Sequence, residues 1–279
     1  MSVIKYCVYG QGLLCVIALA FYFITALPEP SVQRNFSALV FAHRGYYEKA
    51  PENSLAAIQA AYDIGANAVE IDVMQSKDLV PVVIHDQDIR HTTLNEGLVS
   101  NLSADQLLAI PLKDRQTGAA STWHIPSLES AIKLAKNLNI TLEIELKTEI
   151  HNHFAMAKAI QALFLKYDFY EQGFVSSFDP RLLYYVRSIE PNITTALGLL
   201  SHPPYSFVLN YIFQQPFFMD YLGVSIVEPE YTLATDPFIE YWQGQNKQIN
   251  VWVINSQKKK QYLLQKGVSV TSDCILGSC

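Results

Sequence analysis

Short apolar runs alternate with longer amphipathic segments along most of the chain. Segments such as 54–66, 127–138 and 154–167 place apolar residues at helical spacing. Nine shorter runs have the apolar character of buried strands: 39–44, 68–73, 81–85, 141–146, 173–178, 194–200, 221–227, 249–254 and 267–272. Strands that alternate with helices in this way are typical of a parallel sheet covered by helices. The pattern therefore predicts an α/β fold.

The number of strands favours a closed barrel once one short connection is considered. Only seven residues, Met74 to Val80, separate the second and third runs, whereas a parallel crossover needs about a dozen or more. That pair is therefore predicted to form an antiparallel hairpin or bend that turns at Ser76-Lys77-Asp78. Eight strands remain for the parallel set, which favours a TIM-type (β/α)8 barrel over an open doubly wound sheet.

Residues Ile89 to Pro126 interrupt this rhythm with a polar, turn-rich segment. It contains one short amphipathic piece, LSADQLLAI, in which Ser103 can act as the N-cap of a helix. A long irregular segment inside a regular fold is usually an active-site loop or a cap. The sequence therefore predicts a small insertion after the third strand, at about 89–126.

The N-terminus differs from the rest of the chain. Val8 to Leu27 carry no charge over 20 residues, a length that suits one crossing of a bilayer. A secretory signal peptide cleaved after Ala26 is the alternative. We expect 1–35 to comprise a cytoplasmic tip, a transmembrane helix and a linker, and 36–279 to form the barrel domain. With Lys5 in the cytoplasm, a single-pass membrane protein would hold its barrel outside the cytoplasm, in the periplasm of a bacterium.

Composition narrows the range of partners. The chain has 279 residues, a net charge of −6 and only 16% charged residues, so no nucleic-acid-binding surface is expected. An acidic protein can still bind a small phosphate if a bound cation reverses the local field. Cys274 and Cys279 lie five positions apart and either form a small disulfide or remain free thiols. The sequence has no CxxC pair, so cysteines are not expected to bind a metal.

Four of the strand-like runs end in ionisable side chains, which are costly to bury without a partner. In a parallel barrel, side chains at the carboxyl ends of the strands form the active site. Because side chains alternate along a strand, Glu70 and Asp72 share one face, as do Glu143, Glu145 and Lys147. The candidate site residues at these ends are His43, Arg44, Glu70, Asp72, His85, Asp86, Glu145 and Lys147.

These residue types point to metal-assisted acid and base chemistry. Carboxylates held close together repel one another unless some take up protons or a cation lies among them. Oxygen ligands without thiolates favour Ca²⁺ or Mg²⁺. Two histidines beside a divalent cation, here His43 and His85, are the components of acid and base cleavage of a phosphodiester, and of metal-assisted hydrolysis in general. The other histidines are interpreted as structural or surface residues: His91, His124, His151, His153 and His202.

Eight motifs occur in an order that carries more information than any one of them alone. They are HRGYYEKAPENS (43–54), EIDVMQSKDLVPVVIHD (70–86), RHTT (90–93), IPSLESAI (125–132), IELK (144–147), SSFDP (176–180), VWVIN (251–255) and GVSVTSD (267–273). Together they resemble the glycerophosphodiester phosphodiesterase family. The resemblance covers roughly Leu39 to Asp273, which is nearly everything after the apolar N-terminal segment.

The resemblance implies a TIM-type barrel with a small insertion after the HD pair. It also implies a divalent cation held by Glu70, Asp72 and Glu145. His43 and His85 would be the acid and base pair.

Substrate-binding roles follow from the same resemblance. Arg44 and Lys147 correspond to the family's basic groups near the phosphate. Glu52 and Asn53 belong to the PEN motif, and Trp252 belongs to the VWVIN motif. We therefore expect Arg44, Lys147, Glu52 and Trp252 to contact or shape the place of the substrate.

The reaction implied is hydrolysis of a glycerophosphodiester to glycerol 3-phosphate and an alcohol. One histidine would remove the proton of the glycerol 2-hydroxyl, which the cation acidifies, and the other would protonate the departing alcohol. This route passes through a cyclic phosphate. Direct attack by water is the alternative, and the sequence does not separate the two.

Two other functions are weighed against this one. Lysophospholipase D activity on an acylated glycerophosphodiester would use the same site, with the aromatic run Pro203 to Gly223 as an acyl-chain surface. That run also fits an ordinary barrel helix and its loop. A non-catalytic, membrane-tethered binding barrel is the third function, but a binder would not require both histidines together with the acids.

Overall fold

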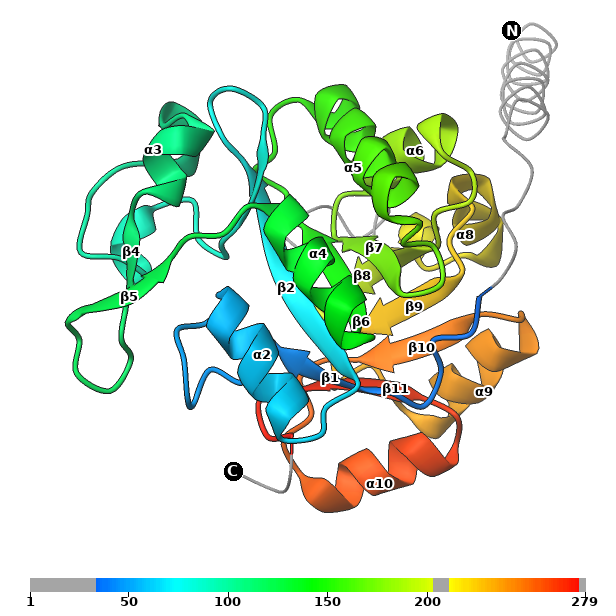
Figure 1. The fold of residues 1–279 in the computed structure, drawn as a ribbon. Coiled ribbons are helices and arrows are strands. Elements are labelled where there is room, and N and C mark those ends of the chain that lie inside the picture. Colours follow the sequence, from blue (N-terminus) through cyan, green and yellow to red (C-terminus); the bar gives the residue numbers. More distant parts are fainter. Residues whose placement is uncertain (1–33, 203–210, 276–279) are drawn as a thin grey trace, which may run out of the picture.

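Strand β1 (Val40–His43) pairs in parallel with β2 (Ala68–Gln75) on one side and with β11 (Ser269–Ser272) on the other. This double pairing closes the sheet into a barrel (Figure 1), which the computed structural model describes over residues 34–202 and 211–275. The ring runs β1-β11-β10-β9-β8-β7-β6-β2. Its other parallel strands are β6 (Thr141–Leu146), β7 (Gly173–Ser177), β8 (Thr195–Leu199), β9 (Ile226–Pro229) and β10 (Gln248–Val251). The predicted (β/α)8 barrel is confirmed.

Helices cover the outside of the barrel and follow most of the strands (Figure 1). They are α2 (Leu55–Asp63), α4 (Leu128–Leu138), α5 (His153–Tyr167), α6 (Pro180–Ile189), α8 (Pro216–Leu222), α9 (Asp236–Gly244) and α10 (Gln257–Gln265). The side chains of Ser54 and Ser127 accept hydrogen bonds from the backbone N–H groups of Ala57 and Ser130 at the starts of α2 and α4. Such a cap satisfies a donor that the helix leaves unpaired and typically contributes about 1 kcal/mol.

The second and third strand-like runs form the predicted hairpin. Strand β3 (Pro81–Val83) pairs antiparallel with β2, so that Val83 lies opposite Val73. At the turn, the backbone N–H of Ser76 donates to the carbonyl oxygen of Val80 at 3.0 Å. The Ser76 hydroxyl also donates to Asp78 Oδ1 at 2.7 Å. This short strand is therefore the one that does not belong to the parallel ring.

One strand lies further along the chain than its apolar pattern suggested. The run 221–227 was expected to be a strand, but α8 continues to Leu222 and β9 begins only at Ile226. Met219 and Leu222, three positions apart, are both buried, which is the spacing of a helix face. Gly223 then ends the helix in the left-handed conformation, with φ +64.

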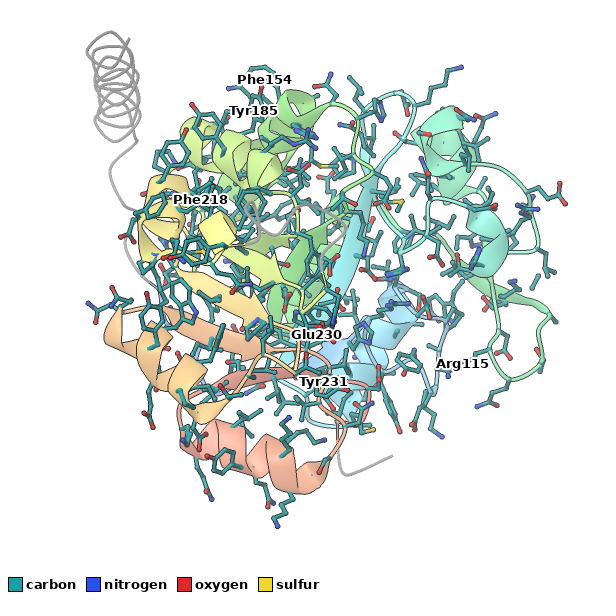
Figure 2. All side chains as sticks on the ribbon, turned by 180° about the vertical axis from the view of Figure 1, so that it is seen from behind. Arg115, Phe154, Tyr185, Phe218, Glu230 and Tyr231 are labelled. Carbon is teal, nitrogen blue, oxygen red and sulfur yellow. The ribbon has the colours of Figure 1, made fainter. Side chains whose placement is uncertain are left out.

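The insertion predicted at 89–126 folds as a small layer beside the barrel (Figure 1). Its elements are the 3-10 helices η1 (Ile89–His91) and η2 (Val99–Asn101), helix α3 (Ala104–Leu108), and the antiparallel strands β4 (Pro111–Lys113) and β5 (Ala120–His124). Ser103 begins α3 in a capping box with Gln106. Arg115, between β4 and β5 and labelled in Figure 2, lies over the ring of Tyr47, 4.4 Å from its centroid. This contact ties the insertion to the loop after β1.

The interior of the barrel changes from apolar to polar along the strands. Near the strand starts, the fully buried rings of Phe41 on β1 and Phe174 on β7 meet edge to face, 5.6 Å between centroids. Because side chains alternate, the next inward positions are two residues further along each strand. These positions carry His43, Glu70, Ser176, Gly198 and Glu228. Polar groups therefore lie above an apolar floor at the carboxyl ends of the strands.

Among the residues that the structure describes, no helix is both long enough and apolar enough to cross a membrane. Val8 to Leu27 lie outside the described residues, so the anchor and the topology stay predictions. Cys274 is disulfide-bonded, which removes the free-thiol alternative for this residue. Cys279 lies outside the described residues.

Candidate active site

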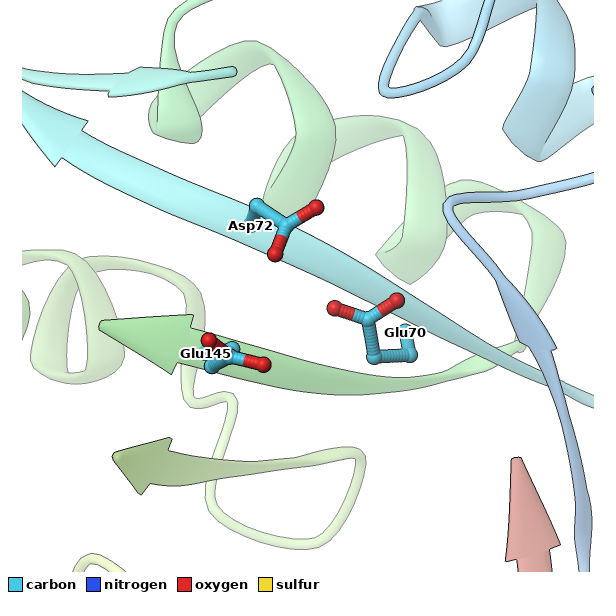
Figure 3. A group of neighbouring side chains, drawn as sticks. All are labelled: Glu70, Asp72 and Glu145. Carbon is cyan, nitrogen blue, oxygen red and sulfur yellow. The ribbon is translucent and has the colours of Figure 1, made fainter. Parts of the chain in front are cut away.

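The register between β2 and β6 brings acidic side chains of two strands together. Asp72 lies opposite Glu145, and Glu70 lies opposite Glu143. Glu70, Asp72 and Glu145 each offer a carboxylate oxygen, and these oxygens lie within 4.8 Å of one another. Figure 3 shows the three carboxylates gathered between β2, which carries two of them, and β6. The structure therefore brings together the three acids predicted as metal ligands.

Two basic side chains reach this cluster. Arg44 Nε lies 3.3 Å from Asp72 Oδ2. Lys147 Nζ donates to Glu145 Oε1 at 2.7 Å and to Asp72 Oδ1 at 3.3 Å. Burial acts against the charge of both cations, but the neighbouring carboxylates outweigh it and raise the pKa of Arg44 and of Lys147. Both side chains therefore remain positive where a phosphate could meet them.

The three acids do not respond alike to this environment. Burial and the nearby Asp72 raise the pKa of Glu70 well above its ordinary value. Burial likewise raises the pKa of Glu145. For Asp72, burial also acts to raise the pKa, but the charges of Lys147 and Arg44 prevail and the pKa falls. Glu70 and Glu145 are thus easier to protonate than ordinary glutamates unless a further positive charge binds among the three acids.

One oxygen of the cluster has no hydrogen-bond partner among the described residues. Glu70 Oε2 accepts from the backbone N–H of Arg44 at 2.9 Å, whereas Glu70 Oε1 is buried and unbonded. An unsatisfied buried polar group costs about 1–3 kcal/mol. A divalent cation would satisfy this oxygen, and an all-oxygen donor set fits Ca²⁺ or Mg²⁺. The residues present therefore fit the predicted cation.

The loop after β1 is shaped by two residues in the left-handed conformation. Arg44 has φ +56 and Gly45 has φ +80. A Cβ on Gly45 would lie 2.7 Å from the backbone of Ala57 in the first turn of α2, so only glycine fits there. A residue other than glycine in the left-handed conformation costs roughly 1–3 kcal/mol. Here the conformation directs the Arg44 backbone N–H at Glu70.

The PEN motif forms hydrogen bonds both with this loop and with the cluster. Asn53 Nδ2 donates to Asp72 Oδ2 at 2.8 Å, and the backbone N–H of Asp72 donates to Asn53 Oδ1 at 3.0 Å. Glu52 Oε1 accepts from Arg44 at 2.8 Å. Glu52 therefore fixes Arg44, and it does not line the cavity described below.

Each of the two predicted catalytic histidines has a carboxylate at its Nδ1 atom. His43 Nδ1 lies 2.6 Å from Asp273 Oδ1, and His85 Nδ1 lies 2.9 Å from Asp86 Oδ1. The hydrogen bond with His43 is the main reason why the pKa of Asp273 lies well below its usual range. An ionised carboxylate can only accept a hydrogen bond, so His43 carries its ring proton at Nδ1 and donates it to Asp273. Its Nε2 atom is then free to take a proton.

His85 reaches the site from the predicted hairpin. It ends the third strand-like run and follows the antiparallel strand β3, which lies outside the ring. The carboxyl end of β3 leads back over the site because β3 folds onto β2. The histidines interpreted as structural or surface residues do not line the cavity that the described residues form.

A second set of buried polar side chains lies beneath the cluster, and the sequence did not predict that they would meet. Asn250 Nδ2 donates to Glu143 Oε2 at 2.8 Å and to Glu228 Oε1 at 3.2 Å. Ser176 Oγ donates to Glu143 Oε1 at 3.0 Å. Burial is the main cause that raises the pKa of Glu228, to about 8. The available signal was the position of Glu228, directly after the predicted strand 221–227, because side chains at the carboxyl ends of barrel strands form the active site.

These groups open into one cavity of about 810 Å³ at the carboxyl end of the barrel. Its polar lining includes the acids, both histidines and both basic side chains. Its apolar lining includes Phe178, Leu200, Phe213, Trp252 and Val253. The Trp252 indole N–H donates to the backbone oxygen of Glu228 at 2.9 Å, and its ring meets Phe178 edge to face. The predicted residues that line the cavity are His43, Arg44, Glu70, Asp72, His85, Glu145, Lys147 and Trp252.

The arrangement of barrel, acids and histidines agrees with a comparison of the sequence with known families. The profile of the glycerophosphoryl diester phosphodiesterase family matches residues 43–273. The chain belongs to this family. The matched range contains every predicted site residue, from His43 at the end of β1 to Trp252 after β10, and also Asp273.

Individual relatives agree with this assignment. Glycerophosphodiester phosphodiesterase 1 of Homo sapiens is 27% identical over 265 residues, which cover 85% of this chain and 78% of the relative. A glycerophosphodiester phosphodiesterase of Bacillus altitudinis is 26% identical over 235 residues, covering 82% of this chain and 91% of the relative. The chain is therefore an enzyme of the glycerophosphodiester phosphodiesterase type, a phosphoric diester hydrolase.

Solved structures share the fold. A phosphodiesterase of Oleispira antarctica, in complex with the product sn-glycerol-3-phosphate, superposes with a TM-score of 0.70 at 23% identity, covering 91% of this chain and 95% of that one. A glycerophosphodiester phosphodiesterase of Parabacteroides distasonis gives a TM-score of 0.68 at 25% identity, covering 84% and 92%. Both solved structures thus share the fold of this chain.

Proposed function

We propose that the protein hydrolyses glycerophosphodiesters to glycerol 3-phosphate and an alcohol with a divalent cation and two histidines. The observation that carries this proposal is the meeting of His43, His85 and the three-acid cluster in one cavity. The named product in the Oleispira antarctica structure supports the same product for this chain.

The cluster formed by Glu70, Asp72 and Glu145 would hold the cation. Its positive charge would stabilise the negative charge that develops on the phosphate oxygens. Arg44 and Lys147 add two fixed positive charges at the same place, and their pKa values keep them charged at neutral pH. These two side chains would bind and orient the phosphate, which lowers the entropic cost of reaching the reactive geometry.

The histidines would move the protons. In its neutral form, a histidine with Nδ1–H held by a carboxylate offers Nε2 as a base, and in its protonated form it offers the Nε2 proton as an acid. His43 with Asp273 and His85 with Asp86 have this arrangement. One would take a proton from the attacking group, either the glycerol 2-hydroxyl or water, and the other would give a proton to the departing alcohol. If the 2-hydroxyl attacks, water then opens the cyclic phosphate to give glycerol 3-phosphate.

The proposal is tested with the purified full chain in detergent. Substrates are glycerophosphocholine, glycerophosphoethanolamine and glycerophosphoinositol, each with Ca²⁺, Mg²⁺ or a chelator, and glycerol 3-phosphate is measured. We expect turnover that requires the cation, and kcat lower by about 10²-fold to 10⁴-fold in His43→Ala and in His85→Ala. The exposed His151 provides the control variant His151→Ala. Full activity in excess chelator, or in both histidine variants, would refute the mechanism.

A second candidate substrate class is favoured by one observation. The cavity of about 810 Å³ is lined by apolar as well as polar side chains, among them Phe178, Leu200 and Phe213. A lysophospholipid would place an acyl chain there, which makes lysophospholipase D activity the second candidate. Release of choline from lysophosphatidylcholine, lowered in Phe213→Ser while turnover of glycerophosphocholine is kept, would support it.

We also propose the topology expected from the sequence. Val8 to Leu27 would anchor the protein in a membrane, with Lys5 in the cytoplasm and the barrel outside it. The test is protease access in cells with an intact inner membrane. Digestion of the barrel from outside supports this orientation, and protection of a membrane-bound barrel refutes it. A mature chain that starts near Leu27 would keep the compartment and remove the anchor.

A further inference from the structure

Aromatic side chains gather on the outer surface of three neighbouring helices. Phe154 on α5 is 54% exposed, Tyr184 and Tyr185 on α6 are 40% and 38% exposed, and Phe217 on α8 is 63% exposed. Figure 2 shows Phe154, Tyr185 and Phe218 along the same edge of the barrel. Contiguous exposed apolar patches are uncommon on proteins that work alone in water, and they mark interaction sites. We call Phe154, Tyr184, Tyr185, Phe217, Phe218 and Tyr221 the aromatic face.

The rings of this face contact one another in sequence across the three helices. Phe154 meets Tyr185 at 6.4 Å, and Tyr185 meets Tyr184 at 6.0 Å, both edge to face. Tyr184 then stacks on Tyr221 of α8 at 6.1 Å, and Tyr221 lies 6.2 Å from Phe218. Ring-to-ring contacts make five of these side chains one continuous surface, and Phe217 lies next to Phe218 in α8.

This surface continues into the wall of the catalytic cavity. Phe218 stacks on Phe213, with 4.8 Å between ring centroids. Phe213 is one of the apolar residues that line the cavity. Contacting aromatic rings therefore connect the outer surface of α6 and α8 with the cavity in which the substrate would be hydrolysed.

Exposed tyrosines elsewhere on the barrel have different surroundings. Tyr262 on α10 donates to Asp236 Oδ1 at 2.5 Å, and the Lys266 ammonium lies 5.1 Å from its ring centroid. That tyrosine belongs to a charged, water-facing group. The rings of the aromatic face contact one another instead, and their mix of phenol and phenyl groups is that of residues at the interface between lipid and water.

The described part of the chain begins beside the same helices. Arg34 donates to Glu171 after α5 at 2.6 Å and to the backbone oxygen of Asn192 after α6 at 2.7 Å. Only six residues, 28–33, separate it from Val8 to Leu27. Six residues span at most about 20 Å. If Val8 to Leu27 are a membrane anchor, the loops that follow α5 and α6 must lie within about this distance of the bilayer.

We propose that the aromatic face lies on the surface of a zwitterionic phospholipid bilayer and opens the catalytic cavity toward it. The net charge of −6 disfavours attraction to anionic lipids, so the binding energy comes from the rings at the interface. The proposal rests on the anchor proposed above, and it does not depend on which substrate the enzyme prefers.

The experiment uses the full chain in phosphatidylcholine vesicles that contain a photoactivatable phosphatidylcholine. After irradiation, peptides that carry lipid adducts are identified by mass spectrometry. We expect adducts on α6 and α8 and none above background on α9 and α10. In Tyr185→Ser/Phe217→Ser, the adduct yield on α6 and α8 should fall by about 10-fold, because this variant lacks two rings that would be partly buried in the lipid. The matched control is Tyr241→Ser/Tyr262→Ser, which removes two exposed rings from α9 and α10.

The outcomes separate failure of the anchor from failure of the docking. If the protein resists an alkaline wash of the vesicles but α6 and α8 carry no more lipid than α9 and α10, the anchor holds and the docking proposal is wrong. Equal loss of adducts in the test and control variants also overturns it. If the wash removes the protein and no adducts form, both the anchor and the docking are refuted. Cross-links between two copies through α6 and α8, in place of lipid adducts, would show a protein interface and overturn the proposal.

Discussion

His43 and Asp273 come from opposite ends of the chain and meet at 2.6 Å between Nδ1 and Oδ1. They meet because β1 and β11 are neighbours in the ring. Asn255 holds the aspartate from the other side, since its Nδ2 donates to Asp273 Oδ2 at 2.8 Å. The carboxylate therefore fixes both the tautomer and the orientation of the imidazole, and Asp273 is a positioning residue that acts through His43.

Asp273→Asn is expected to lower kcat by about 10²-fold to 10⁴-fold, because the amide no longer favours a proton on Nδ1. The kcat is measured with glycerophosphocholine, and the free energy of unfolding is measured by urea titration. A lower kcat that comes with an equally large loss of stability would mean that Asp273 only supports the fold.

Cation binding should stabilise the folded protein independently of turnover. The acids of the cluster repel one another, and a ligand that binds only the folded state stabilises it by about 2.7 kcal/mol at a concentration of 100 Kd. For a domain of this size, that corresponds to a rise in Tm of roughly 5–10 °C. We expect the rise with Ca²⁺ or Mg²⁺ over chelator in wild type. Glu145→Gln, which removes a proposed ligand without changing its size, should reduce it strongly, and an equal rise in that variant would argue against this cation site.

Sequence periodicity predicted the barrel because each of its signals was local. Apolar runs, serine caps and the short connection from Met74 to Val80 are read within a few residues of one another. The three-acid cluster was predictable for a similar reason, since alternation along a strand places Glu70 and Asp72 on one face. Only the register of β2 against β6, which the sequence does not contain, brings Glu145 beside Asp72.

Contacts between distant segments were not predictable in the same way. Asn250 bridges Glu143 and Glu228 from three different strands, and no local pattern marks it. The start of the strand was placed too early, at 221, because the end of helix α8, with buried Met219 and Leu222, is as apolar as the strand that follows it. Only the burial spacing distinguishes these two elements.

The buried acid Glu228 should make stability depend on pH when no cation is present. Burial raises its pKa to about 8, while an unfolded chain would titrate near 4.5. The protonated form therefore stabilises the folded state fully below about pH 4.5, and this contribution is lost as pH rises through about 8.

Glu228→Gln removes that dependence, because glutamine keeps a neutral side chain of similar shape. In chelator, the free energy of unfolding of the variant relative to wild type should rise between pH 5 and 8, by at most about 1.4 kcal/mol for each pH unit. Urea titrations at several pH values measure this difference. The exposed residue Glu149 provides the control variant Glu149→Gln, which should track wild type. Parallel pH profiles for Glu228→Gln and wild type would contradict the assignment.

Gly45 and Gly65 provide a matched pair for the loop that carries Arg44. Both have positive φ, +80 and +91, but a Cβ on Gly45 would lie 2.7 Å from the backbone of Ala57, whereas a Cβ on Gly65 would meet nothing within 4 Å. Alanine at either position incurs the left-handed strain of roughly 1–2 kcal/mol. Only Gly45→Ala adds the overpacking cost of roughly 1–3 kcal/mol against α2.

Gly45→Ala should therefore be the more destabilising variant in chemical denaturation. It should also lower kcat, because relief of the clash moves the loop in which the Arg44 backbone N–H contacts Glu70 and His43 contacts Asp273. Gly65→Ala, whose loop lies between α2 and β2 and outside the cavity, should keep kcat. Equal losses of stability in the two variants would mean that positive φ, rather than the close approach of α2, is what requires glycine after Arg44.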